Sequence, residues 1–141
     1  MAVTISLYNH TAKLFADGSN AVGDTYKVKL FTAATFNATH TTETAAGGTE
    51  VANGNGYTTG GATLSGVAVT TVTTNDAMFD ANDATWSASG GPITANYARI
   101  LNSTDSTPLA FVDFGGSQTA GDGTDFKIVW NASGIFTFTV A

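Results

Sequence analysis

Apolar and polar side chains alternate along several short segments of this 141-residue chain. In residues 25–32, Tyr26, Val28 and Leu30 fall on one face of an extended backbone, and two lysines fall on the other. Successive side chains of a strand point to opposite faces, so this pattern predicts a strand with one buried face. The same reasoning predicts strands at 67–74, 84–87, 97–102, 109–114, 125–131 and 135–140.

Turn signals, rather than long helical patterns, separate these segments. The Asn-Ala-Ser-Gly stretch at 131–134 predicts a hairpin turn between the last two strands. Short strands with turns between them indicate an all-β protein, which we expect to be an antiparallel two-sheet sandwich and specifically a jelly roll. The expected core residues are Val28, Leu30, Phe111, Phe126, Ile128 and Trp130.

Helix is expected only near the N-terminus, at 9–16, with Asn9 as N-cap and Gly18 as the stop signal. Residues 33–66 form one long segment rich in Gly and Thr, which we expect to be a loop. Loops of that length inside a domain are usually functional or mobile. No change in composition divides the chain, so we expect one domain, 1–141, with 1–23 as its N-terminal segment.

Within that loop, residues 53–66 contain five glycines and no charged residue. A phosphate-binding reading fails, because Gly54, Gly56 and Gly60 are spaced one residue too far apart for a dinucleotide fingerprint. A P-loop needs a lysine, and none lies between Lys29 and Lys127. The Asn-Gly pairs instead predict tight turns, since glycine readily takes positive φ angles.

Composition narrows the range of partners. Only 11% of the residues are charged, the net charge is −6, and there is no cysteine. Five scattered cations give no basic patch, so we expect no nucleic-acid partner. The first ten residues lack the features of a signal peptide, and no apolar stretch is long enough to cross a bilayer, so we expect no membrane partner either.

Candidate chemistry is sparse. His10 and His40 stand apart, and no nucleophile-elbow motif accompanies them. Asp76, Asp80 and Asp83 are a weak calcium candidate, but they lack the glycine and the terminal glutamate of an EF-hand loop, and turns explain them equally. We therefore expect no cofactor and no enzymatic activity, and keep a carbohydrate-binding or glycosidase module that uses these carboxylates as the alternative.

Six segments in order resemble a family of small virion structural proteins of tailed bacteriophages: 26–31, 50–64, 78–86, 93–101, 108–116 and 134–138. The most specific are Gly-Tyr-Thr-x-Gly-Gly-Ala-x-Leu at 56–64 and Phe-Asp-Ala-x-Asp-x-x-Trp at 79–86. In size and strand content the chain is also similar to phage cement proteins, which are small jelly-roll proteins on the capsid exterior. The N-terminal 23 residues match less clearly.

The resemblance implies a capsid cement or decoration protein, assembled in the host cytoplasm and located on the virion exterior. Its implied partners are the phage major capsid protein and further copies of the same chain, as a dimer or trimer. A tail or head-to-tail component is the alternative within the particle. We expect the contact surface in the 33–66 segment, at Phe36, Tyr57, Thr58 and Thr59, because interface aromatics often dominate binding energy.

A second possibility for this segment is left open. Phe36 and Tyr57 could instead pin the loop to its own domain. If the segment is instead the contact surface, we expect it to be less ordered in the free protein than in the bound one.

Overall fold

The computed structural model describes residues 3–72 and 75–139, and these form a two-layer antiparallel β-sandwich. The all-β class expected from the sequence is confirmed. The elements are β1 (Thr4–Leu7), α1 (Thr11–Ala16), β2 (Tyr26–Ala33), α2 (Glu43–Ala46), β3 (Thr49–Glu50), β4 (Ala62–Thr63), β5 (Ala68–Thr71), β6 (Ala77–Asp80), β7 (Ala84–Ser87), β8 (Ile93–Asn102), β9 (Thr107–Ala120), β10 (Asp125–Ile128) and β11 (Phe136–Phe138). No helix in the described ranges is both long enough and apolar enough to cross a membrane.

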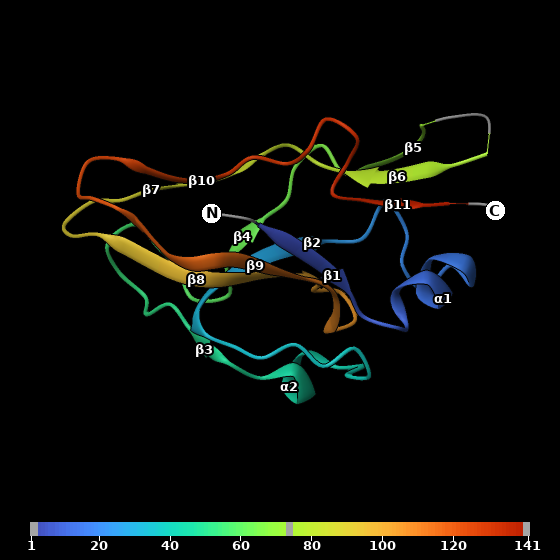
Figure 1. Ribbon diagram of the computed structural model, residues 1–141, viewed down its shortest axis with the longest axis horizontal. Coiled ribbons are helices and arrows are strands. Elements are labelled where there is room, and N and C mark those ends of the chain that lie inside the picture. Colours follow the sequence, from blue (N-terminus) through green and yellow to red (C-terminus); the bar gives the residue numbers. More distant parts are fainter. Residues whose placement is uncertain (1–2, 73–74, 140–141) are drawn as a thin grey trace.

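The first layer is a six-stranded sheet with the order β1-β9-β8-β2-β3, in which β4 also pairs with β2 (Figure 1). Its centre is the long β8–β9 hairpin. The predicted strand 109–114 stops before Gly115 and Gly116, but β9 continues through both glycines to Ala120. Between two pairs of the ladder, Ala95↔Gln118 and Tyr97↔Asp113, β9 advances five residues while β8 advances two. The glycine pair therefore forms a bulge inside the strand rather than a turn.

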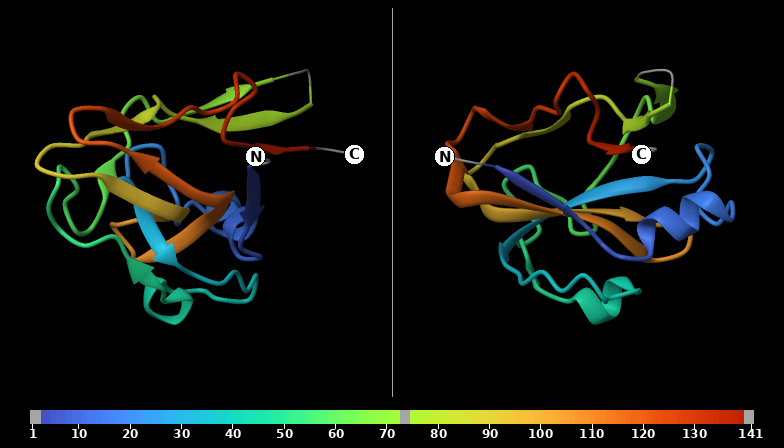
Figure 2. Two further views of the ribbon diagram at one scale, coloured as in Figure 1. Left: turned by 60° about the vertical axis from the view of Figure 1, so that its left-hand side comes forward. Right: turned by 45° about the vertical axis from the view of Figure 1, so that its right-hand side comes forward.

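The second layer consists of β5-β6-β11 and β10-β7, and it lies above the first in Figures 1 and 2. The pairs Ile128↔Ala84 and Phe136↔Phe79 are eight residues apart on the β10–β11 side and five residues apart on the β6–β7 side. β10 and β11 are thus two parts of one interrupted strand that pairs with β7 and β6. The predicted hairpin at 131–134 is wrong. A turn is present there, closed by a hydrogen bond from Gly134 N–H to the Asn131 carbonyl, but the chain continues in the same direction after it.

The core lies between the layers. Tyr26, Val28 and Leu30 point into it from β2 and are fully buried, as their alternation predicted. Phe126, Ile128 and Trp130 enter from the other layer and are also buried, which confirms those predictions. Phe111 is buried too, but on the opposite face of the first sheet.

That opposite face is covered by part of the long 33–66 segment, which is not simply a loop. It contains α2, β3 and β4, so the expectation of at most one helix is corrected by a second, single-turn helix. Figure 1 shows α2 and β3 below the first sheet. Ala46 of α2 packs with Phe111 and Tyr8 in a small second core. Both faces of the first sheet therefore contribute buried side chains to a core.

The N-terminal helix is confirmed with a shifted start. α1 begins after His10 rather than after Asn9, and the cap residue makes no side-chain hydrogen bond. Gly18, at φ 79°, follows its end as predicted. The Phe15 ring lies 5.5 Å from Phe79 and closes one end of the core.

Other strand ends also differ from prediction. β8 begins earlier, at Ile93, and the 125–131 strand ends at Ile128. β5 covers only part of 67–74, and residues 73–74 lie outside the described ranges, as does the predicted strand residue Val140.

Candidate functional site

The glycine-rich stretch is a tight turn. Gly54 N–H donates to the Tyr57 carbonyl, and Tyr57 N–H donates to the Gly54 carbonyl, both at 2.9 Å. The two central residues, Asn55 and Gly56, have φ angles of 53° and 90°. Positive φ at both central positions is typical of a type I′ turn. The glycines therefore reverse the chain, as the sequence predicted, and the short strand β4 follows instead of the helix that a dinucleotide site requires.

Two glycines in this stretch also let it lie directly against neighbouring backbone. A Cβ atom at Gly56 would lie 2.0 Å from the Ser87 carbonyl oxygen of β7. One at Gly61 would lie 2.1 Å from the Val28 carbonyl oxygen of β2. The turn is thus packed onto both layers of the sandwich. A side chain at Gly56 or Gly61 would push the turn away from the neighbouring strand.

Tyr57 is a core residue rather than a contact residue. Its side chain is 2% exposed, and its ring lies 6.1 Å from that of Trp86. Its hydroxyl donates to Glu50 Oε1 at 2.7 Å and accepts from Leu30 N–H at 3.1 Å. Burial raises the pKa of the Tyr57 phenol above its usual range; the Leu30 hydrogen bond opposes this shift and Glu50 adds to it. The expectation that Tyr57 faces a partner is therefore wrong.

Glu50 also fastens the rest of the turn. Its Oε1 accepts a second hydrogen bond, at 2.6 Å, from Gly60 N–H, and its other oxygen lies 4.0 Å from Lys29 Nζ. One carboxylate thus holds the hydroxyl of Tyr57, the backbone after it and a lysine of β2. No pattern in the sequence indicated this role for Glu50.

Arg99 anchors the other half of the segment beneath the first sheet. It is 1% exposed, its guanidinium lies 4.5 Å from the centre of the Phe31 ring, and it pairs with Glu43 Oε1 at 2.8 Å. It also donates to the Gly47 carbonyl at 2.6 Å. Lys29 Nζ lies 3.5 Å from the same Glu43 oxygen. These contacts favour the reading in which the loop is pinned to its own domain.

The other three predicted contact residues are exposed. Phe36 is 37% exposed and rests its ring 5.1 Å from that of Tyr8 and 5.7 Å from that of Phe111. Thr58 and Thr59 follow the turn and face solvent. Their role as partner contacts stays a prediction.

The acidic cluster is distributed along the second layer. Asp76 directly precedes β6 and Asp80 is its last residue, so about 13 Å of extended chain separates them. Asp83 is bound elsewhere: one oxygen accepts from Trp130 N–H at 3.0 Å, and the other pairs with Lys127 at 3.1 Å. These two contacts, in that order, lower the Asp83 pKa. Across residues 3–72 and 75–139, no three His, Asp or Glu side chains are grouped so as to hold a metal.

The histidines are far from this cluster in the chain. His10 Nε2 lies 2.7 Å from the Pro108 carbonyl oxygen, so that nitrogen carries a proton and tethers α1 to β9. His40, in the 33–66 segment, is half-buried. His10 therefore has a structural contact, and among the described residues neither histidine joins the aspartates in a group that could hold a metal.

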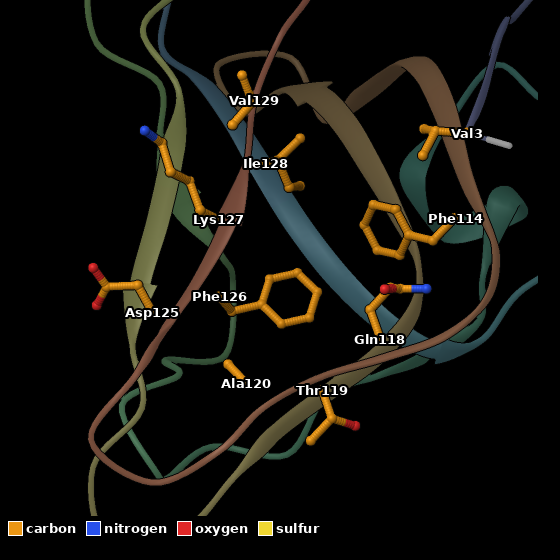
Figure 3. A pocket seen from close by; sticks show the side chains of 10 residues that line it. All are labelled: Val3, Phe114, Gln118, Thr119, Ala120, Asp125, Phe126, Lys127, Ile128 and Val129. Carbon is orange, nitrogen blue, oxygen red and sulfur yellow. The ribbon is translucent and has the colours of Figure 1, made fainter. Parts of the chain in front are cut away.

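A pocket at one open side of the sandwich was not predicted. It lies between β9 and β10 (Figure 3) and has a volume of about 370 Å³. Phe114, Phe126 and Ile128 point into it, while Val3 and Val129 lie at its mouth and are 59% and 69% exposed. The one sequence signal was the consecutive apolar pair Ile128-Val129, which breaks the alternation of the strand and leaves one member outside the core.

Three acidic side chains thus act as internal ties, with Glu43, Glu50 and Asp83 each holding two segments together, and only Asp83 belongs to the acidic cluster that the sequence singled out. Their neighbours are backbone amides, lysines and an arginine of the same domain. Comparison of the chain with protein-family models, with curated proteins and with solved structures gives no match.

Proposed function

We propose that this chain is a structural protein of a tailed-bacteriophage virion, and specifically a cement protein that binds the outside of the major capsid protein shell. The observation that carries the proposal is the surface chemistry. Two of the five cations and two of the eleven acids, Lys29, Arg99, Glu43 and Glu50, lie beneath the first sheet as one neutral group. The other three cations and nine acids are spread along a chain whose polar residues are mostly Thr, Ser, Asn and Gly.

A weakly charged, hydroxyl-rich exterior suits a protein present in many neighbouring copies. Repulsion between like charges grows as copies accumulate on one particle, so a low density of charge lowers the cost of close packing. The 25 threonines supply hydrogen-bonding surface without that repulsion. The ordered resemblance of six segments to phage virion proteins supports the same role.

The topology is compatible with this proposal. β8–β9 pair in the first layer, and the chains on either side of that hairpin pair in the second layer as β6/β7 with β10/β11. One long hairpin is therefore folded across both layers, which is how strands pair in part of a jelly roll. We propose a non-enzymatic role for this domain, with the exposed residues Phe36, Thr58 and Thr59 as capsid contacts.

The first test is the copy number of the protein in purified virions, measured by quantitative gel densitometry. A cement protein is expected in hundreds of copies per particle. A few to some dozens of copies would overturn the capsid assignment in favour of a tail or connector position. Absence from virions would overturn the virion role altogether.

The second test addresses the contact residues. Purified protein is added to particles that lack it, and bound protein is measured after sedimentation. Phe36→Ser is expected to abolish decoration with little change in melting temperature, because the ring is only partly buried. Val69→Ser is the matched control, since Val69 is 39% exposed and lies on β5, away from the covering segment. Normal decoration by Phe36→Ser would exclude Phe36 as a contact.

A further inference from the structure

One edge of the second layer is unpaired. Among the described residues, β10 has β7 as its ladder partner on one side and no strand on the other. Ala88 N–H donates to the Thr124 carbonyl at 2.8 Å, in the same register. Since backbone groups in an antiparallel strand point alternately to the two sides, Phe126 and Ile128 bond toward β7. Asp125 and Lys127 therefore direct their N–H and C=O groups toward the open edge.

This edge borders the pocket between β9 and β10. Residues 125–129 line the pocket along its length, and Val129 and Val3 expose apolar surface at its mouth (Figure 3). Ile5 of the edge strand β1 is also 36% exposed. Free backbone groups beside apolar side chains are the features that strand addition uses.

The side chains on this edge are complementary to themselves. Asp125 and Lys127 lie on the outer face and are exposed, while Phe126 between them points inward. If two copies align β10 antiparallel about Phe126, Asp125 of each copy lies opposite Lys127 of the other. These positions are the ones whose backbone groups face the edge, so one register provides both hydrogen bonds and opposite charges. Centring the pair on Lys127 would instead place two ammonium groups opposite each other.

We propose that the free edge of β10 is a self-association surface, on which two copies pair antiparallel with Asp125 opposite Lys127 twice. The second copy covers the pocket mouth, including Val3 and Val129. The inference goes beyond the proposed virion role and holds for the isolated chain. Because the contact is small, we expect a weak dimer, with a Kd on the order of 100 µM.

The experiment is sedimentation velocity of the full chain at concentrations from about 10 µM to about 1 mM, a range that brackets a weak interface. The wild type is expected to shift from 14.4 kDa toward twice that mass. Asp125→Lys and Lys127→Asp each turn two attractive pairs into two repulsive ones. Each variant alone is expected to raise the Kd at least about tenfold.

Two further samples make the test specific. An equimolar mixture of the two variants restores both opposite-charge pairs across the interface, so a heterodimer is expected. The double variant Asp125→Lys/Lys127→Asp restores them within a homodimer, although it loses the contacts of Asp125 with Ser87 and of Lys127 with Asp83. Recovery in both samples separates the interface from local effects on folding, which melting curves monitor.

Lys13→Asp is the control for net charge, because it changes the charge from −6 to −8, as Lys127→Asp does, at an exposed position on α1. It is expected to dimerise like the wild type, apart from a small general repulsion. A wild type that stays monomeric at every concentration overturns the proposal. A dimer that survives both reversals, or a mixture that fails to associate, overturns it equally.

Discussion

At the scale of single residues, this protein uses several of its few charges inside the structure. Arg99, fully buried, is neutralised by Glu43 and stacks on Phe31. A buried charge is tolerated only when it is paired and hydrogen-bonded, and Arg99 donates to the carboxylate and to backbone carbonyls of the covering segment. Tyr57 follows the same rule, since its buried hydroxyl is both a donor and an acceptor.

Tyr57→Phe tests that rule. Removing the hydroxyl leaves Leu30 N–H and a Glu50 oxygen without this partner, so we expect a loss of about 1–3 kcal/mol in the free energy of unfolding near neutral pH, measured by urea denaturation. The folded-state pKa of Tyr57 lies above the ordinary value of 10.0. The stability from its neutral form is therefore fully present below pH 10 and is lost as the pH rises further.

The pH dependence separates this role from simple loss of packing. Above about pH 10, the usual tyrosine pKa, the wild type is expected to lose more stability with rising pH than Tyr57→Phe. The difference between the two curves isolates Tyr57 from Tyr26, whose pKa is also raised, mainly by burial. Parallel curves would show that the Tyr57 phenol ionises equally easily in the folded and unfolded states.

At the scale of elements, glycines decide where the chain can pass. The turn around Gly56 lies against β7 because no side chain intervenes. The segment that follows α2 is likewise held close to the first sheet, through Arg99 and Glu43. Segment 33–66 has little regular structure of its own. The close backbone contact at Gly56 and the Arg99–Glu43 pair therefore define its path over the sandwich.

Gly56→Ala and Gly90→Ala form a matched pair. Their φ angles are similar, at 90° and 83°, so both substitutions carry the backbone cost of a positive φ, about 1 kcal/mol. A Cβ at Gly90 would meet no atom within 4 Å, whereas one at Gly56 would collide with the Ser87 carbonyl. We expect Gly56→Ala to lower the melting temperature clearly more than Gly90→Ala. Equal effects would mean that the turn moves away from β7 without cost.

A double-mutant cycle measures how tightly the covering segment is tied down. Arg99→Met leaves the Glu43 carboxylate without its closest cation, so a loss of about 3 kcal/mol is expected. In Arg99→Met/Glu43→Gln the unpaired charge is gone, and the double variant is expected to be more stable than Arg99→Met. Additive effects in urea denaturation would indicate that the two side chains do not interact.

At the scale of the whole molecule, the two layers are unequal. The first sheet has six strands, while the second layer is interrupted, with three strands at one end (β5-β6-β11) and two at the other (β10-β7). The pocket beside β10 opens at the side of the sandwich where the second layer ends. The other face of the first sheet is covered by α2 and its flanking chain (Figure 2).

The same overall arrangement separates the aspartates of the acidic cluster. Since Asp83 is engaged by Trp130 and Lys127 and β6 holds Asp76 and Asp80 apart, we expect a chelator to leave the melting temperature unchanged. Thermal unfolding with and without a chelator, and with added calcium, checks this. A drop that calcium restores would contradict it, because a ligand bound to the folded state raises stability.

Much of the fold could be predicted from local patterns. Alternation in β2 identified the buried face carrying Val28 and Leu30, and the Asn-Gly pairs identified a turn. Burial of Phe126, Ile128 and Trp130 was also predicted correctly. The side-chain period of two determines which residues share a face, and that information is present within a few neighbouring positions.

Pairing between distant segments could not be read in this way. The Asn131–Gly134 signal is a genuine turn, but only the register of β10 with β7 and of β11 with β6 shows that it does not reverse the chain. The predicted strand 109–114 stopped before Gly115 and Gly116, which form a bulge inside β9, because bulges and turns favour the same residue type. Tyr57 seemed available to a partner because its loop is polar, yet its ring fits between two sheets that approach only in the folded state.

By itself the sequence determined the strand-rich class, the buried faces of individual strands, the scarcity of charge and the positions of the turns, because each depends on residues close together in the chain. Tertiary structure alone decided that Glu43 and Glu50 are internal ties, that Asp83 holds two strands together and that one edge of β10 is left open. Those outcomes depend on which distant backbones come within hydrogen-bonding distance. Contacts of that kind are made by packing, and no local pattern of side chains specifies them.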